Sequence, residues 1–101
     1  MSVISGLNCY IVSYDIMDRK RLYRVHIAMK GFGEPVHYSV FRCDLTPKGR
    51  VGMVAALTDL IKPDEDRIMI IDMGPTEGGV EGRIEFLGVH HEDKEEKFII
   101  V

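Results

Sequence analysis

Residues 10–21 read YIVSYDIMDRKR, a run of aromatic and β-branched residues that changes abruptly into charge. The apolar part predicts a strand over residues 8–15, and Asp18 then provides an N-cap for a helix over residues 19–32. Asp15 stands at the exit of the strand. Four basic residues follow it closely: Arg19, Lys20, Arg21 and Arg24. A carboxylate surrounded by cations is the first candidate for a chemical role.

The helix is amphipathic, with glycines at its end. Its apolar face consists of Leu22, Val25, Met29 and Phe32, and Gly31 and Gly33 stop it. Residues 34–45 are again rich in β-forming residues and predict one bent strand or two short ones, without placing the bend. Thr46 and Pro47 begin a second helix, which Pro63 ends.

The last third of the chain predicts more strands. DRIMIIDM (66–73) is almost continuously apolar, which is typical of a strand at the centre of a sheet. GPTEGGVEG (74–82) predicts a loop or hinge, and RIEFLGV (83–89) predicts a short strand before a solvated charge run. We therefore predict one domain, with a core over residues 1–74 and a hinge with a C-terminal strand and tail over 75–101.

This order of elements predicts an α+β fold of the ferredoxin-like βαββαβ type with an extra C-terminal strand. Both helices then cover one face of the sheet and leave the other face open. Four aromatic residues are expected on strands: Tyr14, Tyr38, Phe41 and Phe86. They lead us to expect a second copy over the open face, giving a homodimer with its sheets packed face to face.

The composition is that of an ordinary globular domain, with 101 residues of which 46% are hydrophobic. No apolar run approaches the ~20 residues of a membrane span, and no signal pattern opens the chain. We therefore expect a cytoplasmic protein with no membrane partner. Cys9 and Cys43 predict two buried thiols rather than a disulfide.

Charge is divided unevenly along the chain. Residues 1–63 carry nine Lys and Arg against five Asp and Glu, whereas residues 64–101 carry four against eleven. The first half suits phosphate contacts, and the second half argues against a protein that coats nucleic acid on every face. The candidate nucleic-acid-binding residues are Arg19, Lys20, Arg21, Arg24, Lys48 and Arg50. Lys48 and Arg50 fit a solvated helix surface equally well.

Three segments together resemble the CRISPR-associated protein 2 family: VSYDIMDRKRLYRV (12–25), GEPVHYSVFRCDL (33–45) and DRIMIIDMG (66–74). IEFLG (84–88) also resembles the strand after the hinge in some members. The resemblance implies a ferredoxin-like homodimer that exchanges C-terminal strands. It further implies a subunit that bridges dimers of the CRISPR integrase, CRISPR-associated protein 1, and binds duplex DNA during spacer acquisition. Several members are Mg²⁺-dependent nucleases on RNA or DNA.

The resemblance also implies a site. Asp15 becomes the metal residue, facing its copy in the other subunit with Mg²⁺ between them. The implied catalytic set is Asp15, Arg19, Arg21, Arg24 and Phe41. The chain departs from the family where Arg-Val-Gln usually precedes YSVF, because Pro35, Val36 and His37 stand there. A phosphate-contacting cation is thus missing, which favours a non-cutting scaffold over a phosphodiesterase.

Simpler interpretations of these residues stay open. Asp15 alone fits a turn or cap, and Asp18 fits an N-cap better than a ligand. Tyr14 and Tyr38 fit packing better than base stacking. His90 and His91 are adjacent on an expected strand, where they point opposite ways, so we do not expect both to bind one metal. The alternatives for the whole protein are a toxin-type ribonuclease and another ferredoxin-like regulatory module.

Overall fold

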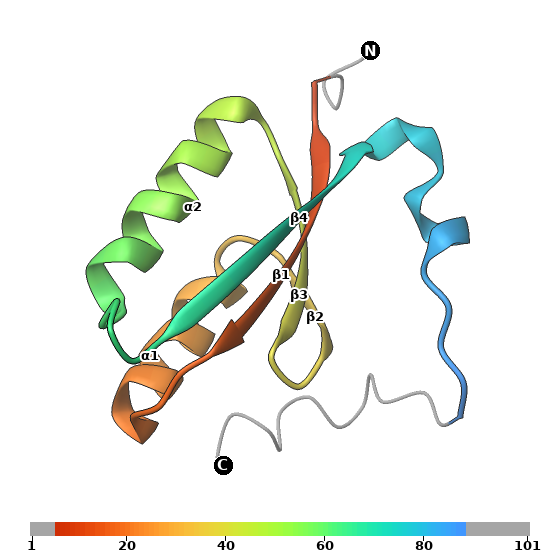
Figure 1. Ribbon diagram of the computed structural model, residues 1–101. Helices are drawn as coiled ribbons and strands as arrows, with labels where there is room; N and C mark the ends of the chain where they lie inside the picture. The colour runs from red at the N-terminus through yellow and green to blue at the C-terminus, as the bar shows by residue number, and fades with distance from the viewer. Residues whose placement is uncertain (1–5, 89–101) are drawn as a thin grey trace.

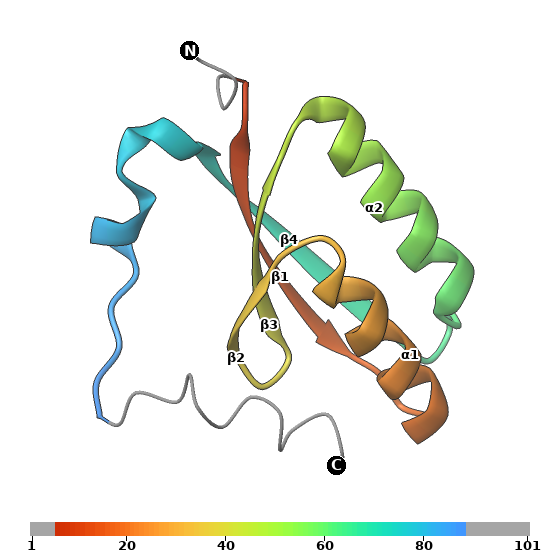
Figure 2. The same cartoon turned by 180° about the vertical axis from the view of Figure 1, so that it is seen from behind.

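The computed structural model describes residues 6–88. Its elements are β1 (Asn8–Asp15), α1 (Arg19–Lys30), β2 (Glu34–His37), β3 (Val40–Leu45), α2 (Pro47–Leu60) and β4 (Arg67–Pro75), followed by 3-10 turns over Thr76–Gly78 and Val80–Arg83. The four strands form one antiparallel sheet in the order β2-β3-β1-β4. Both helices cover one face, and residues 76–88 stand on the other side (Figures 1 and 2). The predicted ferredoxin-like α+β fold is confirmed.

Both helices begin at the predicted caps. The Asp18 carboxylate accepts a hydrogen bond from the backbone N–H of Arg21 at 3.0 Å, and the Thr46 hydroxyl accepts one from Gly49 at 3.0 Å. Helix α1 ends two residues earlier than predicted, at Lys30. Gly33 is required just beyond it, because a Cβ there would collide with the carbonyl oxygen of Arg42 on β3. Within the described residues neither helix is long and apolar enough to cross a membrane.

The core lies between the helices and the sheet. Its buried members are Tyr10, Val12, Tyr14, Ile16, Val25, Met29, Phe41, Cys43, Met53 and Leu57. The register places Val12 opposite Phe41 and Tyr10 opposite Cys43, so both strands direct alternate residues at the helices. The prediction of two buried free thiols at Cys9 and Cys43 is confirmed. Burial raises the pKa of the Cys43 thiol to about 11.

Of the four aromatic residues expected on strands, two lie on strands and two do not. Tyr14 and Phe41 are on strands and point into the core, so these two side chains are not exposed to a second copy. Residues 34–45 form two strands, and Tyr38 lies in the turn between them, 59% exposed. Phe86 is exposed and outside any strand. The prediction that all four lie on strands is therefore wrong for Tyr38 and Phe86.

Strand β4 is an edge strand and not the central one that its sequence predicted. Ile68 and Ile70 pack toward the core, whereas Met69 and Ile71 are 51% and 42% exposed on the opposite side. We call that side the open face. Strand pairing assigns to it Ile11, Ser13, Asp15, Val40, Arg42, Arg67, Met69 and Ile71. The continuous apolar run thus reflects a second face that residues 6–88 leave uncovered along Met69 and Ile71.

The segment after β4 packs against one end of the open face. Val80 is fully buried there, and the Glu81 carboxylate accepts a hydrogen bond from the Arg42 guanidinium at 3.1 Å. The strand predicted over residues 83–89 is wrong for the single chain, because residues 80–83 form a 3-10 turn and 84–88 pair with no strand. This turn carries the chain away from the sheet edge. His90, His91 and the tail lie outside the described residues.

Candidate metal and nucleic-acid site

Asp15 is the last residue of β1 and lies exposed at one end of the open face. Strand β4 brings Arg67 directly opposite it. On the other side β3 does not reach Asp15, because its first residue, Val40, pairs with Ser13. The turn between β2 and β3 lies there instead, and its Ser39 carbonyl accepts a hydrogen bond from the Tyr14 backbone N–H at 3.0 Å. Within residues 6–88 no hydrogen bond or ion pair holds the Asp15 carboxylate. The structure therefore leaves this carboxylate available to a ligand.

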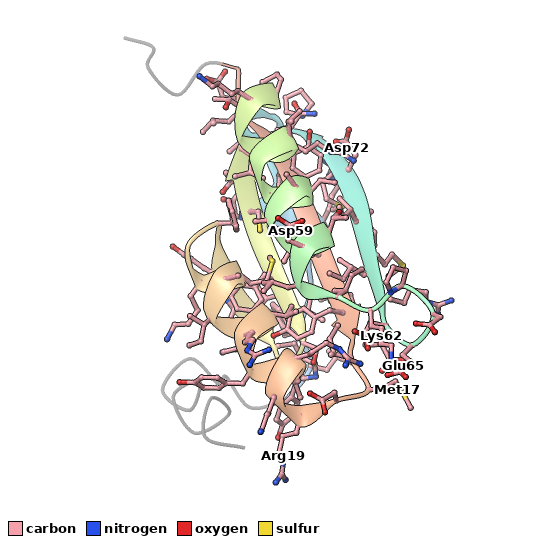
Figure 3. All side chains as sticks on the ribbon, turned by 90° about the vertical axis from the view of Figure 1, so that its left-hand side faces the viewer. Met17, Arg19, Asp59, Lys62, Glu65 and Asp72 are labelled. Atoms are coloured by element: carbon pink, nitrogen blue, oxygen red, sulfur yellow. The ribbon has the colours of Figure 1, made fainter. Side chains whose placement is uncertain are left out.

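Arg19, Lys20 and Arg24 lie on the first two turns of α1, next to this end of the sheet. All three are exposed, and none has an ion pair with a described residue. Figure 3 shows Arg19 projecting away from the molecule at this end. Asp18 is the N-cap, and the hydrogen bond from the Arg21 backbone N–H lowers the pKa of its carboxyl group. The three cations are therefore a free surface suited to phosphate contacts.

Arg21 is different, because its guanidinium is occupied. Its Nε donates to the Asp66 carboxylate at 2.8 Å, and its Nη2 donates to Glu65 at 2.8 Å. The Asp66 side chain is completely buried, and it also accepts hydrogen bonds from the backbone N–H groups of Met17 and Lys62. The Arg21 hydrogen bonds hold the pKa of Asp66 well below its usual range.

This cluster, which we call the Asp66 clamp, joins three segments of the chain. They are the β1–α1 connection, the first turn of α1 and the α2–β4 connection. Figure 3 shows Met17, Lys62 and Glu65 together at this end of the molecule. Arg21 therefore fixes the position of the helix start that carries Arg19 and Lys20, and the structure gives it this role rather than a free position facing a phosphate.

Phe41 is buried with no exposed surface, and its ring packs against Tyr14 and His26. The Tyr14 hydroxyl and His26 Nδ1 are hydrogen-bonded at 2.7 Å. Burial raises the pKa of Tyr14 to about 12. Phe41 thus lies on β3 beside β1, where its ring packs against Tyr14 and supports the strand that ends at Asp15, and the structure does not bring it to a ligand.

Lys48 and Arg50 lie at the opposite end of the sheet from Asp15. Helix α2 starts where β3 ends, beside Asn8, and β1 runs from there for about 23 Å before it reaches Asp15. The Arg50 guanidinium stacks on the Tyr10 ring, 5.4 Å from its centroid. The predicted nucleic-acid residues therefore form two separate groups.

The departure at residues 35–37 also has a definite geometry. Pro35 is placed opposite Phe41 and so lies on the helix-covered side, away from Asp15. His37 pairs with Val40 and stands on the open side, two strands away from β1, with its ring against Tyr38. Neither residue supplies a cation next to Asp15.

Three features of the site were missed by sequence reasoning: Asp66, His26 and Arg67. Each depends on a partner far away in sequence, and only the spacing of Val25, His26 and Met29 on one helix could have indicated that His26 is buried. Within residues 6–88 no group of three or more His, Cys, Asp or Glu residues could hold a metal ion. A metal at Asp15 would have to take its other ligands from water, from a second copy or from substrate, which suits Mg²⁺.

Comparison with known proteins identifies the family. A family model described as CRISPR associated protein Cas2 matches residues 8–77. The chain belongs to the Cas2 family. A Rhodospirillum rubrum protein named CRISPR-associated endoribonuclease Cas2 1 is 38% identical over 94 residues, which are 93% of this chain and 91% of that protein. A Geobacter sulfurreducens protein named CRISPR-associated endoribonuclease Cas2 is 41% identical over 68 residues, covering 67% and 72% of the two chains.

Solved structures agree with this assignment. The crystal structure of Streptococcus pyogenes Cas2 at pH 6.5 superposes with a TM-score of 0.70 at 32% identity, covering 79% of this chain and 99% of that one. A hypothetical protein from Thermus thermophilus gives a TM-score of 0.72 at 28% identity, covering 83% and 94%. The Cas2 segment, residues 8–77, spans the whole sheet and both helices, and with them Asp15, Arg67 and the Asp66 clamp.

Proposed function

We propose that this chain acts in CRISPR-based defence as a homodimer in which two Asp15 residues form a Mg²⁺-dependent site that cleaves RNA. The observation that carries the proposal is the exposed and unpartnered Asp15 carboxylate at the end of an open, partly apolar sheet face. The names of the similar proteins, CRISPR-associated endoribonucleases, support the class of reaction.

The physical argument begins with the open face. Exposed Met69 and Ile71 favour a second copy over this face, because apolar area removed from water stabilises association. A two-fold axis near the Asp15 end would bring two carboxylates together, and like charges at short range require a proton or a cation between them. Mg²⁺, when bound there, would supply an acidified water and neutralise charge on a phosphodiester.

The other exposed residues have roles that follow from their positions. Arg19, Lys20 and Arg24 would bind the phosphates on either side of the scissile bond and hold the strand in register. Arg21 would keep α1 in place through the Asp66 clamp, so that these three side chains approach Asp15 from a fixed direction. Phe41 would act only by packing against Tyr14 and His26 in the core.

A cleavage assay tests the proposal. Labelled single-stranded RNA and duplex DNA are incubated with the wild-type dimer in Mg²⁺ and in EDTA. We expect Mg²⁺-dependent cleavage of RNA that falls at least about 100-fold in Asp15→Asn. Asp59→Asn is the matched control, since Asp59 is exposed on α2. Cleavage that survives in Asp15→Asn, or that is lost equally in Asp59→Asn, would contradict the proposal.

The second candidate function is a scaffold that does not cut. In it the dimer binds duplex DNA by its backbone and bridges dimers of the CRISPR integrase, CRISPR-associated protein 1. The occupied Arg21 favours it, because one of the expected phosphate contacts is committed to Asp66 and Glu65. A well-folded wild-type dimer that binds duplex DNA and integrase but cuts neither RNA nor DNA in Mg²⁺ would establish this function instead.

A further inference from the structure

We infer that Arg67 is a phosphate-binding residue of the Asp15 site, an inference that rests on the proposed function. Arg67 lies directly opposite Asp15 in the β1–β4 pairing, and both side chains are exposed at the same end of the open face. Directly opposed residues of antiparallel strands have Cα atoms about 4.5–5.5 Å apart and side chains on the same face. Within residues 6–88 strand pairing brings no other cation so close to Asp15.

The Arg67 guanidinium is also uncommitted. The open face carries one other arginine, Arg42, and this one is paired with Asp44 at 3.3 Å and Glu81 at 3.1 Å. Arg21 is held by the Asp66 clamp, whereas no hydrogen bond or ion pair to a described residue holds the Arg67 side chain. Of the two arginines that strand pairing places on this face, Arg67 is therefore the one whose guanidinium is free to bind a ligand.

An ion pair with Asp15 is the simplest other role for Arg67. No such pair forms within 4.0 Å in the described chain, although the two side chains are neighbours. A cation shared by two Asp15 carboxylates would neutralise them and leave Arg67 as the positive group beside them. The flat guanidinium fork then matches the oxygens of a phosphate group. Met69, the next residue on this side of β4, is apolar, and a second copy over it would exclude water from the neighbourhood of Arg67.

The test measures binding separately from cleavage. Affinity for a fluorescent single-stranded RNA is followed by anisotropy over a range of salt concentrations, in EDTA and with Asp15→Asn in every variant, so that the carboxylate charges are absent and neither metal nor cutting contributes. Arg67→Gln should weaken binding about tenfold and reduce the salt slope by about 0.7, the value for one lost phosphate contact on a single strand. Arg67→Lys keeps the charge and should restore the slope.

Arg83→Gln is the matched control, because Arg83 follows the other end of β4 and donates to the Met73 carbonyl at 2.7 Å. It should bind within about twofold of wild type. Equal slopes for Arg67→Gln and Arg83→Gln would overturn the inference, and so would an Arg67→Lys variant that fails to restore the slope. Wild type that binds through Arg67 but never cuts RNA in Mg²⁺ would instead refute the proposed cleavage and keep the inference.

Discussion

The two faces of the sheet differ in how completely residues 6–88 bury them. On the helix-covered face Val12 and Phe41 have no exposed surface, whereas on the open face Met69 and Ile71 remain about half exposed. The same strands supply both sets, because successive side chains point to opposite sides. The covered face accounts for the fold of a single chain. The open face, with Asp15 at its end, is the face to which the proposed function assigns the association and the chemistry.

The largest effect on folding is expected from Phe41→Ala on the covered face. The ring is fully buried against Tyr14 and His26, so its loss leaves a cavity and should lower the free energy of unfolding by about 3–5 kcal/mol. Urea denaturation measures it. Val40→Ala, the neighbouring residue on the open face, should cost less than about 1 kcal/mol. Equal losses in the two variants would mean that the faces do not differ in this way.

Asp66→Asn should give the next largest effect, because it removes the buried charge that holds Arg21 and three chain segments together. The pKa of Asp66 is lowered in the folded protein. The clamp therefore stabilises the fold fully at pH values above the ordinary carboxyl pKa of about 4, and this stabilisation is lost as the pH falls below that value and Asp66 becomes protonated. The melting midpoint should therefore fall less steeply between pH 6 and pH 2 in Asp66→Asn than in wild type, as measured by thermal unfolding.

Glu65→Gln is the control for the clamp. Glu65 also accepts from Arg21, but its side chain is 42% exposed, so its loss should change the melting midpoint and its acid dependence only slightly. If Glu65→Gln and Asp66→Asn shift the acid limb equally, the network is a surface ion pair and not a buried clamp.

Tyr14→Phe should have a smaller effect, about 1 kcal/mol, because it removes the hydroxyl group that bonds His26 at 2.7 Å and leaves the ring in place. The raised pKa of about 12 adds a pH test. An unfolded tyrosine ionises near pH 10, so wild type should lose stability between about pH 10 and pH 12 as the unfolded state releases its proton first. This loss of stability at alkaline pH, followed by urea denaturation, should be smaller in Tyr14→Phe. If the pH dependence of stability is the same in both proteins, groups other than Tyr14 cause the loss.

The sequence predicted the covered face well and the open face poorly. Helix starts at Asp18 and Thr46 and the ferredoxin-like order all follow from local patterns of capping and periodicity. β4 was placed at the centre of the sheet because it has apolar residues on both faces. This sequence pattern is the same whether the second face is covered by the same chain or by another one. The Asp66 clamp joins residues 45 positions apart, so Arg21 looked as free as Arg19. Asp15 was singled out because it stands where a pattern changes, and its functional role stays a prediction.

Ile71→Asp should have the least effect on the fold of the single chain and the clearest effect on assembly. Ile71 is already 42% exposed, so a charge there costs the isolated chain little, but it would be desolvated against a second copy. Sedimentation should show a monomer for Ile71→Asp and a dimer for Val51→Asp, the control on α2, where Val51 is 67% exposed. RNA cleavage should disappear with the dimer, because one chain supplies one Asp15. If Val51→Asp is the variant that dissociates, the helices form the interface, and the open face must be completed by some surface other than a second copy.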